Sequence, residues 1–339
     1  MSREIAEQPA ALAATIDALL PLAPEAGALA RQTRTVLLIA RGTSDNAAVY
    51  GSYLIQGYAG RLATLAAPSI ATTYRSRMDL SGVLAVALSQ SGRTQEIVDT
   101  LAWARDCGAR TLAITNGAGS PLAQTADLAF ITRAGTEQAV PATKTYTTQL
   151  AALAVLALGL GADLDPGELR GVPEAVAGML APAPDFSAIV AELALVPGVV
   201  VSGRGLAYSA ALELALKLKE ACYLHAMGLS YADLLHGPIA MVDADTPAIV
   251  LAADSGPTLA GTVELARRVT SAGAMAYGIG GGAQLAAACS KSLPGPALPE
   301  WLAPMGLIVP GQLLTEALSR SLGLDPDAPR GLSKVTQTS

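Results

Sequence analysis

The stretch VLAVALSQSGRT, residues 83–94, runs from an unbroken apolar segment directly into a cluster of polar side chains around a glycine. Its apolar half has the composition of a buried strand, and Ser89, Gln90, Ser91 and Thr94 follow at the end of that strand. A parallel strand normally leads into a helix, and the first turn of a helix presents unpaired N–H groups with a partial positive charge. The stretch therefore predicts a strand, an anion-binding turn and a helix.

The hydroxyl and amide donors of this turn suit a phosphate monoester, whose oxygens accept several hydrogen bonds. Gly92 lets the backbone come close to such a ligand. Neither the dinucleotide fingerprint GxGxxG nor the triphosphatase loop GxxxxGK[ST] occurs at this turn, so a small phosphorylated metabolite is favoured over a nucleotide. The alternative is that Ser91 only caps a helix, which serines often do.

Apolar, β-branched runs alternate along the chain with Ala- and Leu-rich segments of helical period. This alternation is typical of parallel sheets covered by helices, and it predicts an α/β fold. The runs that we expect to form strands are TVLLIA (35–40), GVLAVALS (82–89), RTLAIT (110–115), DLAFIT (127–132), GVVVSG (198–203) and TPAIVLA (246–252).

The second half of the chain repeats landmarks of the first half at one nearly constant offset. Two pairs follow predicted strands and lie 163 and 164 residues apart: Arg41-Gly42 with Arg204-Gly205, and Ser91-Gly92 with Ser255-Gly256. A third pair, RTLAIT and AMAYGI (274–279), has about the same offset. The repeat predicts two similar α/β subdomains joined by the Pro-rich stretch 172–187. A chance match in an Ala-rich sequence is the alternative.

The two copies of the predicted anion-binding turn differ in charge. Where the first copy has Ser89 and Gln90, the second has Ala253 and Asp254, in the stretch AADSGPT (252–258). A carboxylate beside a helix start repels a dianion. We therefore expect only the first copy to bind phosphate.

The composition argues against several classes of protein. Hydrophobic residues make up 51% of the chain and charged residues 15%, but no apolar run reaches the ~18 residues without polar breaks that a membrane span needs. The N-terminus lacks a basic region before its apolar part, so it predicts a helix and no secretion signal, and we expect a cytoplasmic protein.

A net charge of −6 without basic clusters argues against a nucleic-acid partner. Cys107, Cys222 and Cys289 are far apart in the sequence, so we expect three core thiols, and neither disulfides nor a zinc site.

Eight motifs, in order from about residue 30 to the C-terminus, resemble the isomerase part of the glutamine–fructose-6-phosphate aminotransferases, which is a tandem of two sugar isomerase (SIS) domains. The motifs are ARGTS (40–44), SQSGRT (89–94), LAITN (112–116), RAGTE (133–137), TKTYTTQL (143–150), LELALKLKE (212–220), HGPIA (236–240) and PRGLSK (329–334). The resemblance implies two tandem SIS subdomains, each a parallel sheet flanked by helices in three αβα layers, and a C-terminal tail.

We expect an N-terminal helix (1–24), a first SIS domain that binds the phosphosugar (25–170), a second SIS domain (185–325) and a tail that closes the active site (326–339). The full aminotransferases begin with a glutaminase domain whose nucleophile is an N-terminal cysteine. This chain begins Met-Ser-Arg and has about 30 residues before its first predicted strand. By that criterion it is not expected to take ammonia from glutamine.

The resemblance implies substrate contacts in several loops. The residues that match the sugar-phosphate-binding positions of the family are Ser44, Ser89, Gln90, Ser91 and Thr94, and those that match a loop holding the sugar are Val140, Ala142 and Thr143. The family usually has a serine where this chain has Ala142. One hydroxyl contact is lost, which leaves the identity of the substrate at that end of the sugar open.

Glu220 resembles the general base of the family, which moves a proton between C1 and C2 of the sugar. Lys217 lies three residues earlier on the same face of a predicted helix, and Glu213 four residues before Lys217. Ordinary helix ion pairs are the alternative interpretation of this spacing. We accept that alternative for Lys219 and assign catalytic roles to Lys217 and Glu220.

His236 matches the histidine that opens the sugar ring, and an imidazole can both donate and accept a proton near neutral pH. In the family this histidine comes from the neighbouring subunit, which implies a homodimer with shared active sites. His225 is interpreted as structural. Lys334 matches a lysine that forms a Schiff base with the open-chain ketose, and closure of the tail would exclude water from it. In a deaminase it could serve only to position the substrate, and a lysine in a polar tail is otherwise usually solvated.

These residues predict an SIS-type deaminase–isomerase that interconverts glucosamine 6-phosphate with fructose 6-phosphate and ammonia, without a metal or redox cofactor. One alternative is a fructosamine-6-phosphate deglycase or another phosphosugar aldose–ketose isomerase. A second is a sensor that binds a sugar phosphate and does no chemistry. A sensor would not need Glu220, His236 and Lys334 together, and no helix-turn-helix fits before residue 30.

Overall fold

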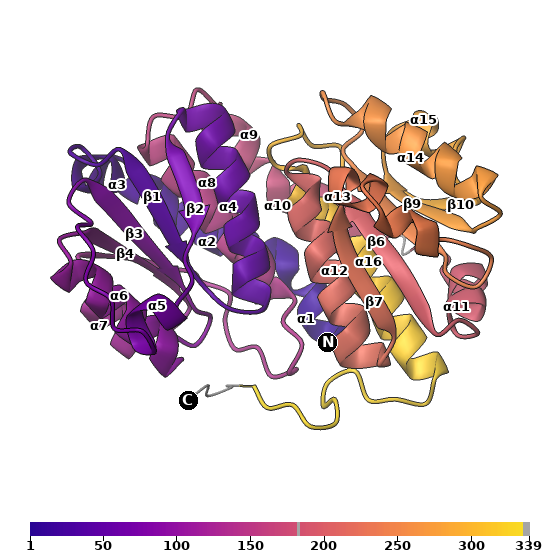
Figure 1. Ribbon diagram of the computed structural model, residues 1–339, viewed down its shortest axis with the longest axis horizontal. Coiled ribbons are helices and arrows are strands. Elements are labelled where there is room, and N and C mark those ends of the chain that lie inside the picture. The colour runs from indigo at the N-terminus through magenta and orange to yellow at the C-terminus, as the bar shows by residue number, and fades with distance from the viewer. Residues whose placement is uncertain (182–183, 335–339) are drawn as a thin grey trace. The chain divides into compact units, whose positions relative to one another are not determined.

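The computed structural model describes residues 1–181 and 184–334, and within these ranges it contains two five-stranded parallel sheets (Figure 1). The chain divides into two compact units. The N-unit comprises Ala10–Glu137, Lys144–Arg170 and the tail from Ser333, and the C-unit comprises Met1–Pro9, Gln138–Thr143 and Gly171–Leu332. All neighbouring strands pair in parallel, which confirms the predicted α/β fold.

The sheet of the N-unit has the strand order β2-β1-β3-β4-β5. Its strands are β1 (Thr35–Ile39), β2 (Leu62–Leu65), β3 (Val83–Leu88), β4 (Arg110–Thr115) and β5 (Leu128–Ile131). Its helices are α2 (Gln8–Leu19, whose first two residues belong to the C-unit), η1 (Leu20–Leu22), α3 (Ala23–Leu29), α4 (Thr43–Ala59), α5 (Ser69–Thr72), α6 (Gln95–Asp106), α7 (Pro121–Thr125), α8 (Lys144–Gly159) and α9 (Pro166–Arg170).

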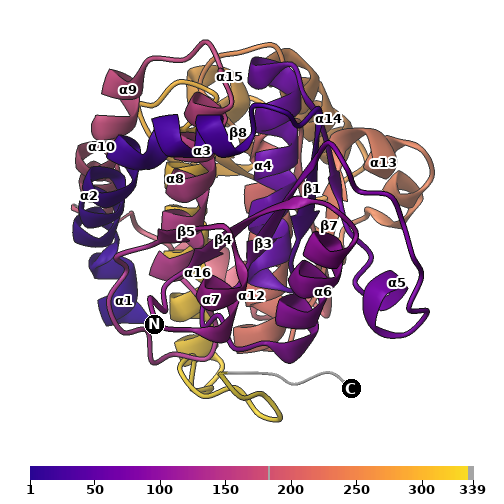
Figure 2. The same cartoon turned by 90° about the vertical axis from the view of Figure 1, so that its left-hand side faces the viewer.

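Both faces of this sheet are apolar, because successive side chains of a strand point to opposite faces and nearly all of them are hydrophobic. Ile39, Ala85 and Ala113 belong to one core cluster together with Ile97 and Leu101 of α6. Helices α4 and α8 pack together and cover the other face (Figure 2). The sheet therefore has helices on both sides, and the turns at the carboxyl ends of its strands stay free to carry polar residues.

The sheet of the C-unit has the strand order β10-β9-β8-β6-β7. Its strands are β6 (Gly198–Gly203), β7 (His225–Ser230), β8 (Ala248–Ala252), β9 (Ala276–Gly280) and β10 (Lys291–Leu293). Its helices are α1 (Ser2–Ala6), α10 (Val172–Leu180), α11 (Ser187–Leu193), α12 (Ala207–Cys222), α13 (Tyr231–Leu235), η2 (Pro238–Met241), α14 (Leu259–Ser271), α15 (Gly282–Ala286) and α16 (Ala303–Ser321). Val200, Val250 and Ala276 pack with residues of α14 and α15, while α12 and α16 pack against each other.

The two sheets have the same strand order when β6–β10 are matched to β1–β5 in sequence, so the predicted repeat is present in the fold. Its glycine landmarks all have a positive φ. Gly42 and Gly205 have φ of 57° and 61°, and Gly92 and Gly256 have φ of 63° and 112°. These are values at which a side chain is strained, so the repeat preserved glycines where each strand turns toward a helix.

All six predicted strands are confirmed, and β9 coincides with AMAYGI (274–279), the segment that the repeat matched to RTLAIT. The strands β2, β7 and β10 were not predicted. The three missed strands lie at sheet edges, where one flank has no neighbouring strand. Short or polar-containing sequences such as LATL in β2 and KSL in β10 lack the apolar run that identifies a central strand. The Pro-rich stretch 172–187 is also more ordered than a plain linker, because α10 occupies Val172–Leu180.

Two further expectations need qualification. Residues Gln8–Leu29 are long and apolar enough to cross a membrane by length and composition, a criterion that core helices also meet. In the structure they form α2, η1 and α3.

The three cysteines are free thiols, and Cys222 is buried whereas Cys107 and Cys289 are half-buried. Burial raises the pKa of Cys222 to about 12 and that of Cys289 to about 11, so neither is a thiolate at neutral pH.

Candidate functional site

The predicted anion-binding turn connects β3 to α6 in the N-unit, and its serines are engaged by the turn's own backbone. The N–H of Gly92 donates to Ser89 Oγ at 3.2 Å, and the N–H of Arg93 donates to Ser91 Oγ at 3.2 Å. Thr94, not Ser91, is the N-cap residue of α6, and its side chain makes no capping bond. The alternative role of Ser91 as a helix cap is therefore wrong, and α6 begins with an uncapped, electropositive first turn.

The loop after β4 holds this turn in place. The carbonyl of Gln90 accepts hydrogen bonds from the N–H of Asn116 at 3.1 Å and from Thr115 Oγ1 at 3.3 Å. A Cβ atom on Gly92 would lie 2.1 Å from Ser120 Oγ and 2.7 Å from Thr115 Oγ1. Glycine is thus required at position 92 both by its positive φ and by the lack of space.

Ser44 lies in the first turn of α4, at the end of β1, which is the direct neighbour of β3. The Arg41 guanidinium joins the two strand ends through a double hydrogen bond to Glu96, at 3.0 and 2.9 Å. Ser44 is buried, and its Oγ accepts a hydrogen bond from Gln149 Nε2 of α8 at 3.0 Å. The structure therefore brings Ser44 to the same sheet edge as the β3–α6 turn. Gln149 was not predicted to take part.

Asp45 introduces a carboxylate beside these donors. Burial raises the pKa of Asp45, and the positive charge of Arg41 opposes that rise. A raised pKa means that the ionised form is disfavoured at this position. The site thus carries one acidic group whose charge would oppose a phosphate.

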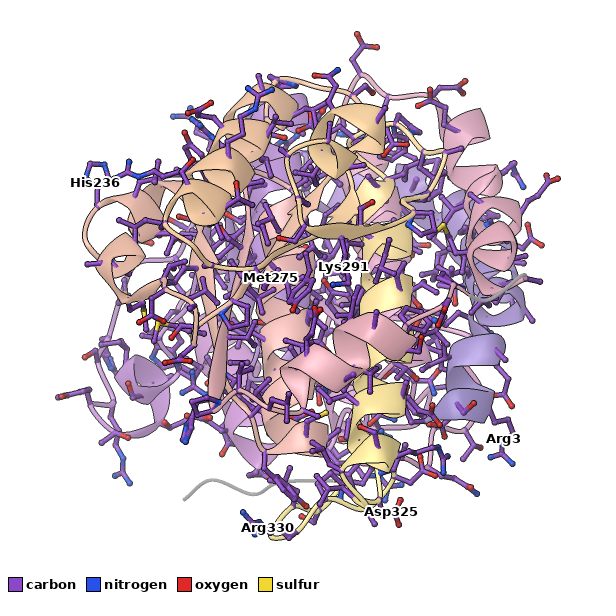
Figure 3. All side chains as sticks on the ribbon, turned by 90° about the vertical axis from the view of Figure 1, so that its right-hand side faces the viewer. Arg3, His236, Met275, Lys291, Asp325 and Arg330 are labelled. Atoms are coloured by element: carbon purple, nitrogen blue, oxygen red, sulfur yellow. The ribbon has the colours of Figure 1, made fainter. Side chains whose placement is uncertain are left out.

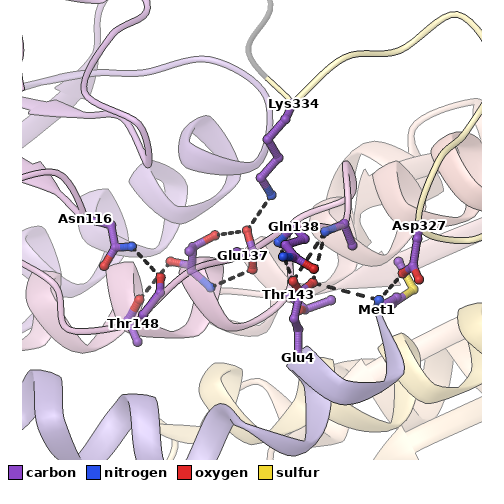
Figure 4. Close-up of polar contacts among 12 residues, drawn as sticks. Met1, Glu4, Asn116, Glu137, Gln138, Thr143, Thr148, Asp327 and Lys334 are labelled. Atoms are coloured by element: carbon purple, nitrogen blue, oxygen red, sulfur yellow. Dashed lines mark hydrogen bonds and ion pairs between the residues drawn. The ribbon is translucent and has the colours of Figure 1, made fainter.

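Glu137 is a second residue that the sequence did not single out. Its carboxylate is buried and accepts hydrogen bonds from the Thr145 N–H at 3.1 Å and from Thr145 Oγ1 at 2.6 Å. Lys334 Nζ lies 2.7 Å from the same carboxylate (Figure 4). A cavity of about 490 Å³ in the N-unit has both Glu137 and Gln90 in its wall. Lys334 is thus paired with a buried carboxylate while its side chain stays 25% exposed, and Glu137 lines the same cavity as Gln90 of the predicted anion-binding turn.

The loop with Val140, Ala142 and Thr143 belongs to the C-unit. Glu4 of α1 is buried, and its carboxylate accepts hydrogen bonds from the backbone N–H groups of Gln138 and Ala139 (Figure 4). The N–H of Val140 donates to the carbonyl of Asp327 at 2.9 Å. The loop is therefore held in place by hydrogen bonds of its backbone. This role of Glu4 was not predicted.

The predicted catalytic helix is α12 of the C-unit. Lys217 is buried and lies 3.4 Å from Glu213 Oε1, and it also forms an ion pair with Glu220. Glu220 remains 22% exposed at its side chain, whereas Glu213 is fully buried. A buried ammonium between two carboxylates is electrostatically paired, and only Glu220 has solvent access. Lys219 on the same helix is exposed, in agreement with its interpretation as an ordinary surface residue.

His236 follows α13 and is exposed, with its side chain directed outward (Figure 3). Within the part of the chain that the structure describes, no hydrogen bond joins its side chain to Glu220. A contribution of this histidine to the active site of a neighbouring subunit stays a prediction. His225 is exposed on the edge strand β7.

Comparisons with known proteins identify the family of the chain. The sequence matches the SIS domain over residues 29–159 and 193–291. A glutamine–fructose-6-phosphate aminotransferase of Pyrococcus horikoshii is 34% identical over 98% of this chain, which spans 57% of that relative's length. The solved C-terminal domain of glucosamine-fructose-6-phosphate aminotransferase from Francisella tularensis has a TM-score of 0.87 and 29% identity, with 97% of this chain and 98% of that chain covered. A glucosamine-6-phosphate deaminase from Thermotoga maritima, 24% identical with 99% of each chain covered, shares the fold with a TM-score of 0.78. The chain belongs to the family of SIS domain proteins.

Proposed function

We propose that the protein is a phosphosugar isomerase and, more specifically, a deaminase–isomerase that interconverts glucosamine 6-phosphate with fructose 6-phosphate and ammonia in the cytoplasm. The observation that carries this proposal is Glu220, a partly exposed carboxylate supported by the buried Lys217. The hydroxyl-rich β3–α6 turn supports a phosphorylated substrate, because an uncapped helix start and hydroxyl groups suit a phosphate. The names of the aminotransferase and deaminase relatives support an amino-sugar phosphate.

The proposed reaction begins when the phosphate binds at the β3–α6 turn and His236 opens the sugar ring by proton exchange. Glu220 then removes the proton from C2 and returns it to C1, which converts the aldehyde amine into a ketimine at C2. The ion pair with Lys217 orients Glu220 for this transfer. Water adds to the ketimine carbon, the C–N bond breaks, and ammonia leaves with fructose 6-phosphate as the ketone. No residue of this scheme needs a metal or redox partner.

Lys334 can take part in two ways. As an amine it would form a Schiff base with the ketose, and as an ammonium it would position the substrate. The ion pair with Glu137, at 2.7 Å, favours the second role, because it holds the lysine side chain in one place beside a buried carboxylate. We therefore assign substrate positioning to Lys334 in the deaminase reaction.

The first test is ammonia release from glucosamine 6-phosphate by the purified protein. The wild type should release ammonia, and Glu220→Gln should lower kcat by about 10³-fold because the proton shuttle is lost. Lys219→Gln, an exposed change one position away on α12, is the matched control and should keep the wild-type rate. A wild type that releases no ammonia yet is still stabilised by fructose 6-phosphate would overturn the deaminase proposal and leave a deglycase, another phosphosugar isomerase or a sugar-phosphate sensor.

We also propose a homodimer in which His236 serves the partner's active site, since its side chain points outward in the chain. His236→Asn and Glu220→Gln should each be inactive alone. When the two variants are refolded together, mixed dimers contain one intact site, so about a quarter to a half of the activity should return. No recovery in a verified mixed dimer would contradict a shared site.

The second candidate function is a fructosamine-6-phosphate deglycase or a phosphosugar isomerase without amine chemistry. The observation that favours it is Ala142, which lacks the hydroxyl usual in the aminotransferases and leaves room beside the sugar. Parallel assays with a fructosamine 6-phosphate and with glucosamine 6-phosphate decide between them. A higher kcat/KM for the fructosamine would establish the deglycase.

A further inference from the structure

Gln149 is a buried polar residue without a place in the reaction described above. It lies on α8, whose residues 144–157 are all buried, and it is itself 2% exposed. We infer that Gln149 is a positioning residue that directs the hydroxyl hydrogen of Ser44 toward the substrate's phosphate. The inference rests on the proposed phosphosugar function and deepens it.

The hydrogen bond between these residues has a defined direction. Gln149 Nε2 is the donor and Ser44 Oγ the acceptor, at 3.0 Å, so the bond does not use the hydrogen of Ser44. A serine hydroxyl has one hydrogen and two lone pairs. Among residues 1–181 and 184–334, Gln149 is the only partner of Ser44 Oγ. The hydroxyl hydrogen therefore remains available for an acceptor supplied by a ligand.

The side-chain oxygen of Gln149 gives a second argument that this residue has a functional role. Gln149 Oε1 is buried and has no hydrogen-bond partner in the described part of the chain. An unsatisfied buried acceptor destabilises a fold, and an apolar residue at this position would avoid that penalty. Gln149 is the last polar residue of α8, because Leu150 to Ala157 are entirely apolar. The side-chain hydrogen bond of this buried glutamine leads to a predicted phosphate ligand.

The direction of this hydrogen bond determines which chemical group Ser44 can bind. Ser44 is oriented as a donor, so it selects a group that accepts hydrogen bonds, such as an ionised phosphate oxygen. The nearby carboxylate of Asp45 is also an acceptor, but among the residues that the structure describes no hydrogen bond joins the Ser44 and Asp45 side chains. The amide of Gln149 fixes Ser44 in this donor role before the substrate arrives, which reduces the ordering needed on binding.

A double-mutant cycle tests the inference. Gln149→Leu and Ser44→Ala are made singly and together, and binding of fructose 6-phosphate and of inorganic phosphate is measured by calorimetry. Gln149→Leu should raise Kd about fivefold, the effect of one hydrogen bond, and should raise KM with little change in kcat. Gln149→Leu in the Ser44→Ala background should add nothing, because Gln149 acts through Ser44.

The chain offers a matched control in the pair Gln56 and Ser52, whose Nε2 and Oγ atoms are also 3.0 Å apart, eight residues further along α4. Gln56→Leu should leave both Kd values unchanged. If Gln149→Leu does not fold, Gln149→Glu replaces it. Its carboxylate only accepts, so it should capture the Ser44 hydrogen and weaken phosphate binding more than tenfold.

Two results would overturn the inference: an unchanged Kd in folded Gln149 variants, or full additivity of Gln149→Leu with Ser44→Ala. Both readouts are independent of catalysis. A protein that binds fructose 6-phosphate, shows the coupling and releases no ammonia would refute the deaminase proposal while supporting the role of Gln149. A wild type that binds neither ligand would refute both.

Discussion

The β3–α6 turn of the N-unit and the β8–α14 turn of the C-unit occupy matching places in two sheets of the same strand order, yet they differ in charge. In the C-unit turn, Asp254 accepts a hydrogen bond from the N–H of Gly282 at 3.0 Å. Glu300 accepts one from the Thr258 hydroxyl at 2.8 Å. The protein's own carboxylates thus occupy donors in the C-unit that, in the N-unit, stay available to an external anion.

The two units also differ at the ends of their first strands, β1 and β6. At the offset of the repeat, Ala207 stands in the C-unit where Ser44 stands in the N-unit, so the second copy lacks this hydroxyl as well. Ser255 and Thr258 are kept. The comparison teaches that the duplicated fold provides two similar turns that differ at three positions and in the additional carboxylate of Glu300. On the proposed function, these differences restrict phosphate binding to the turn of the N-unit.

The largest expected effect comes from giving the N-unit turn the residues of the C-unit turn. The double change Ser89→Ala and Gln90→Asp removes two donors and places a carboxylate beside the start of α6. We expect the Kd for fructose 6-phosphate to rise at least about 100-fold, as lost hydrogen bonds and like-charge repulsion combine. Calorimetry measures this directly, and thermal denaturation verifies that the variant is folded.

The reciprocal change, Ala253→Ser with Asp254→Gln, is the control in the C-unit. It should leave the Kd for fructose 6-phosphate unchanged, since that turn does not contact the substrate in the proposed scheme. An equal loss of affinity in both variants would mean that both turns serve the ligand, and the assignment of phosphate binding to the N-unit alone would be wrong.

A smaller effect is expected from alanine at the matching glycines. In Gly92→Ala the new Cβ would meet Ser120 Oγ at 2.1 Å and Ser120 Cβ at 2.5 Å. In Gly256→Ala it would meet Glu300 Oε2 at 2.6 Å, at the end of a flexible side chain that can move away. We expect destabilisation by about 3 kcal/mol for Gly92→Ala and about 1–2 kcal/mol for Gly256→Ala, because both positions have positive φ.

Denaturant titrations of the two alanine variants give these free energies of unfolding. Gly92→Ala should also weaken binding of fructose 6-phosphate, while Gly256→Ala should not. Equal destabilisation together with equal binding would show that the crowding around Gly92 has no special part in shaping the phosphate turn.

The sequence predicted the central part of both sheets because buried parallel strands need continuous apolar runs, as in VLAVAL (83–88) and AIVLA (248–252). The edge strands β2, β7 and β10 lack such an apolar run and were therefore missed. The strand β7, with the sequence HAMGLS, is recognisable only by its pairing with β6. The repeat was predictable because glycines that need positive φ mark the same turn twice.

Within the candidate site, the family resemblance grouped Ser44 with the SQSGRT turn, and the structure brings both to one sheet edge because β1 and β3 are neighbouring parallel strands. Gln149 and Glu137 lie within the quoted motifs TKTYTTQL and RAGTE, but neither they nor Glu4 were given a role from the sequence. Their partners lie far away in sequence: Gln149 is 105 residues from Ser44, and Glu137 is 197 residues from Lys334. Such pairs depend on tertiary packing, and no local spacing or periodicity of the sequence predicts them.

The smallest effect is expected from replacing Asp45, a carboxylate that the C-unit lacks because the matching residue there is Tyr208. Burial raises the pKa of Asp45 above its unfolded value, so the folded protein binds this proton more tightly and loses stability as pH rises through the folded pKa. Asp45→Asn should therefore raise the melting temperature by about 1–2 °C at pH 7, with a smaller gain near pH 4. Asp106→Asn, at an exposed carboxylate of α6, should show no such pH-dependent gain. A gain for Asp45→Asn that is equal at both pH values would attribute the effect to packing, since only the ionised carboxylate can oppose both the fold and the phosphate.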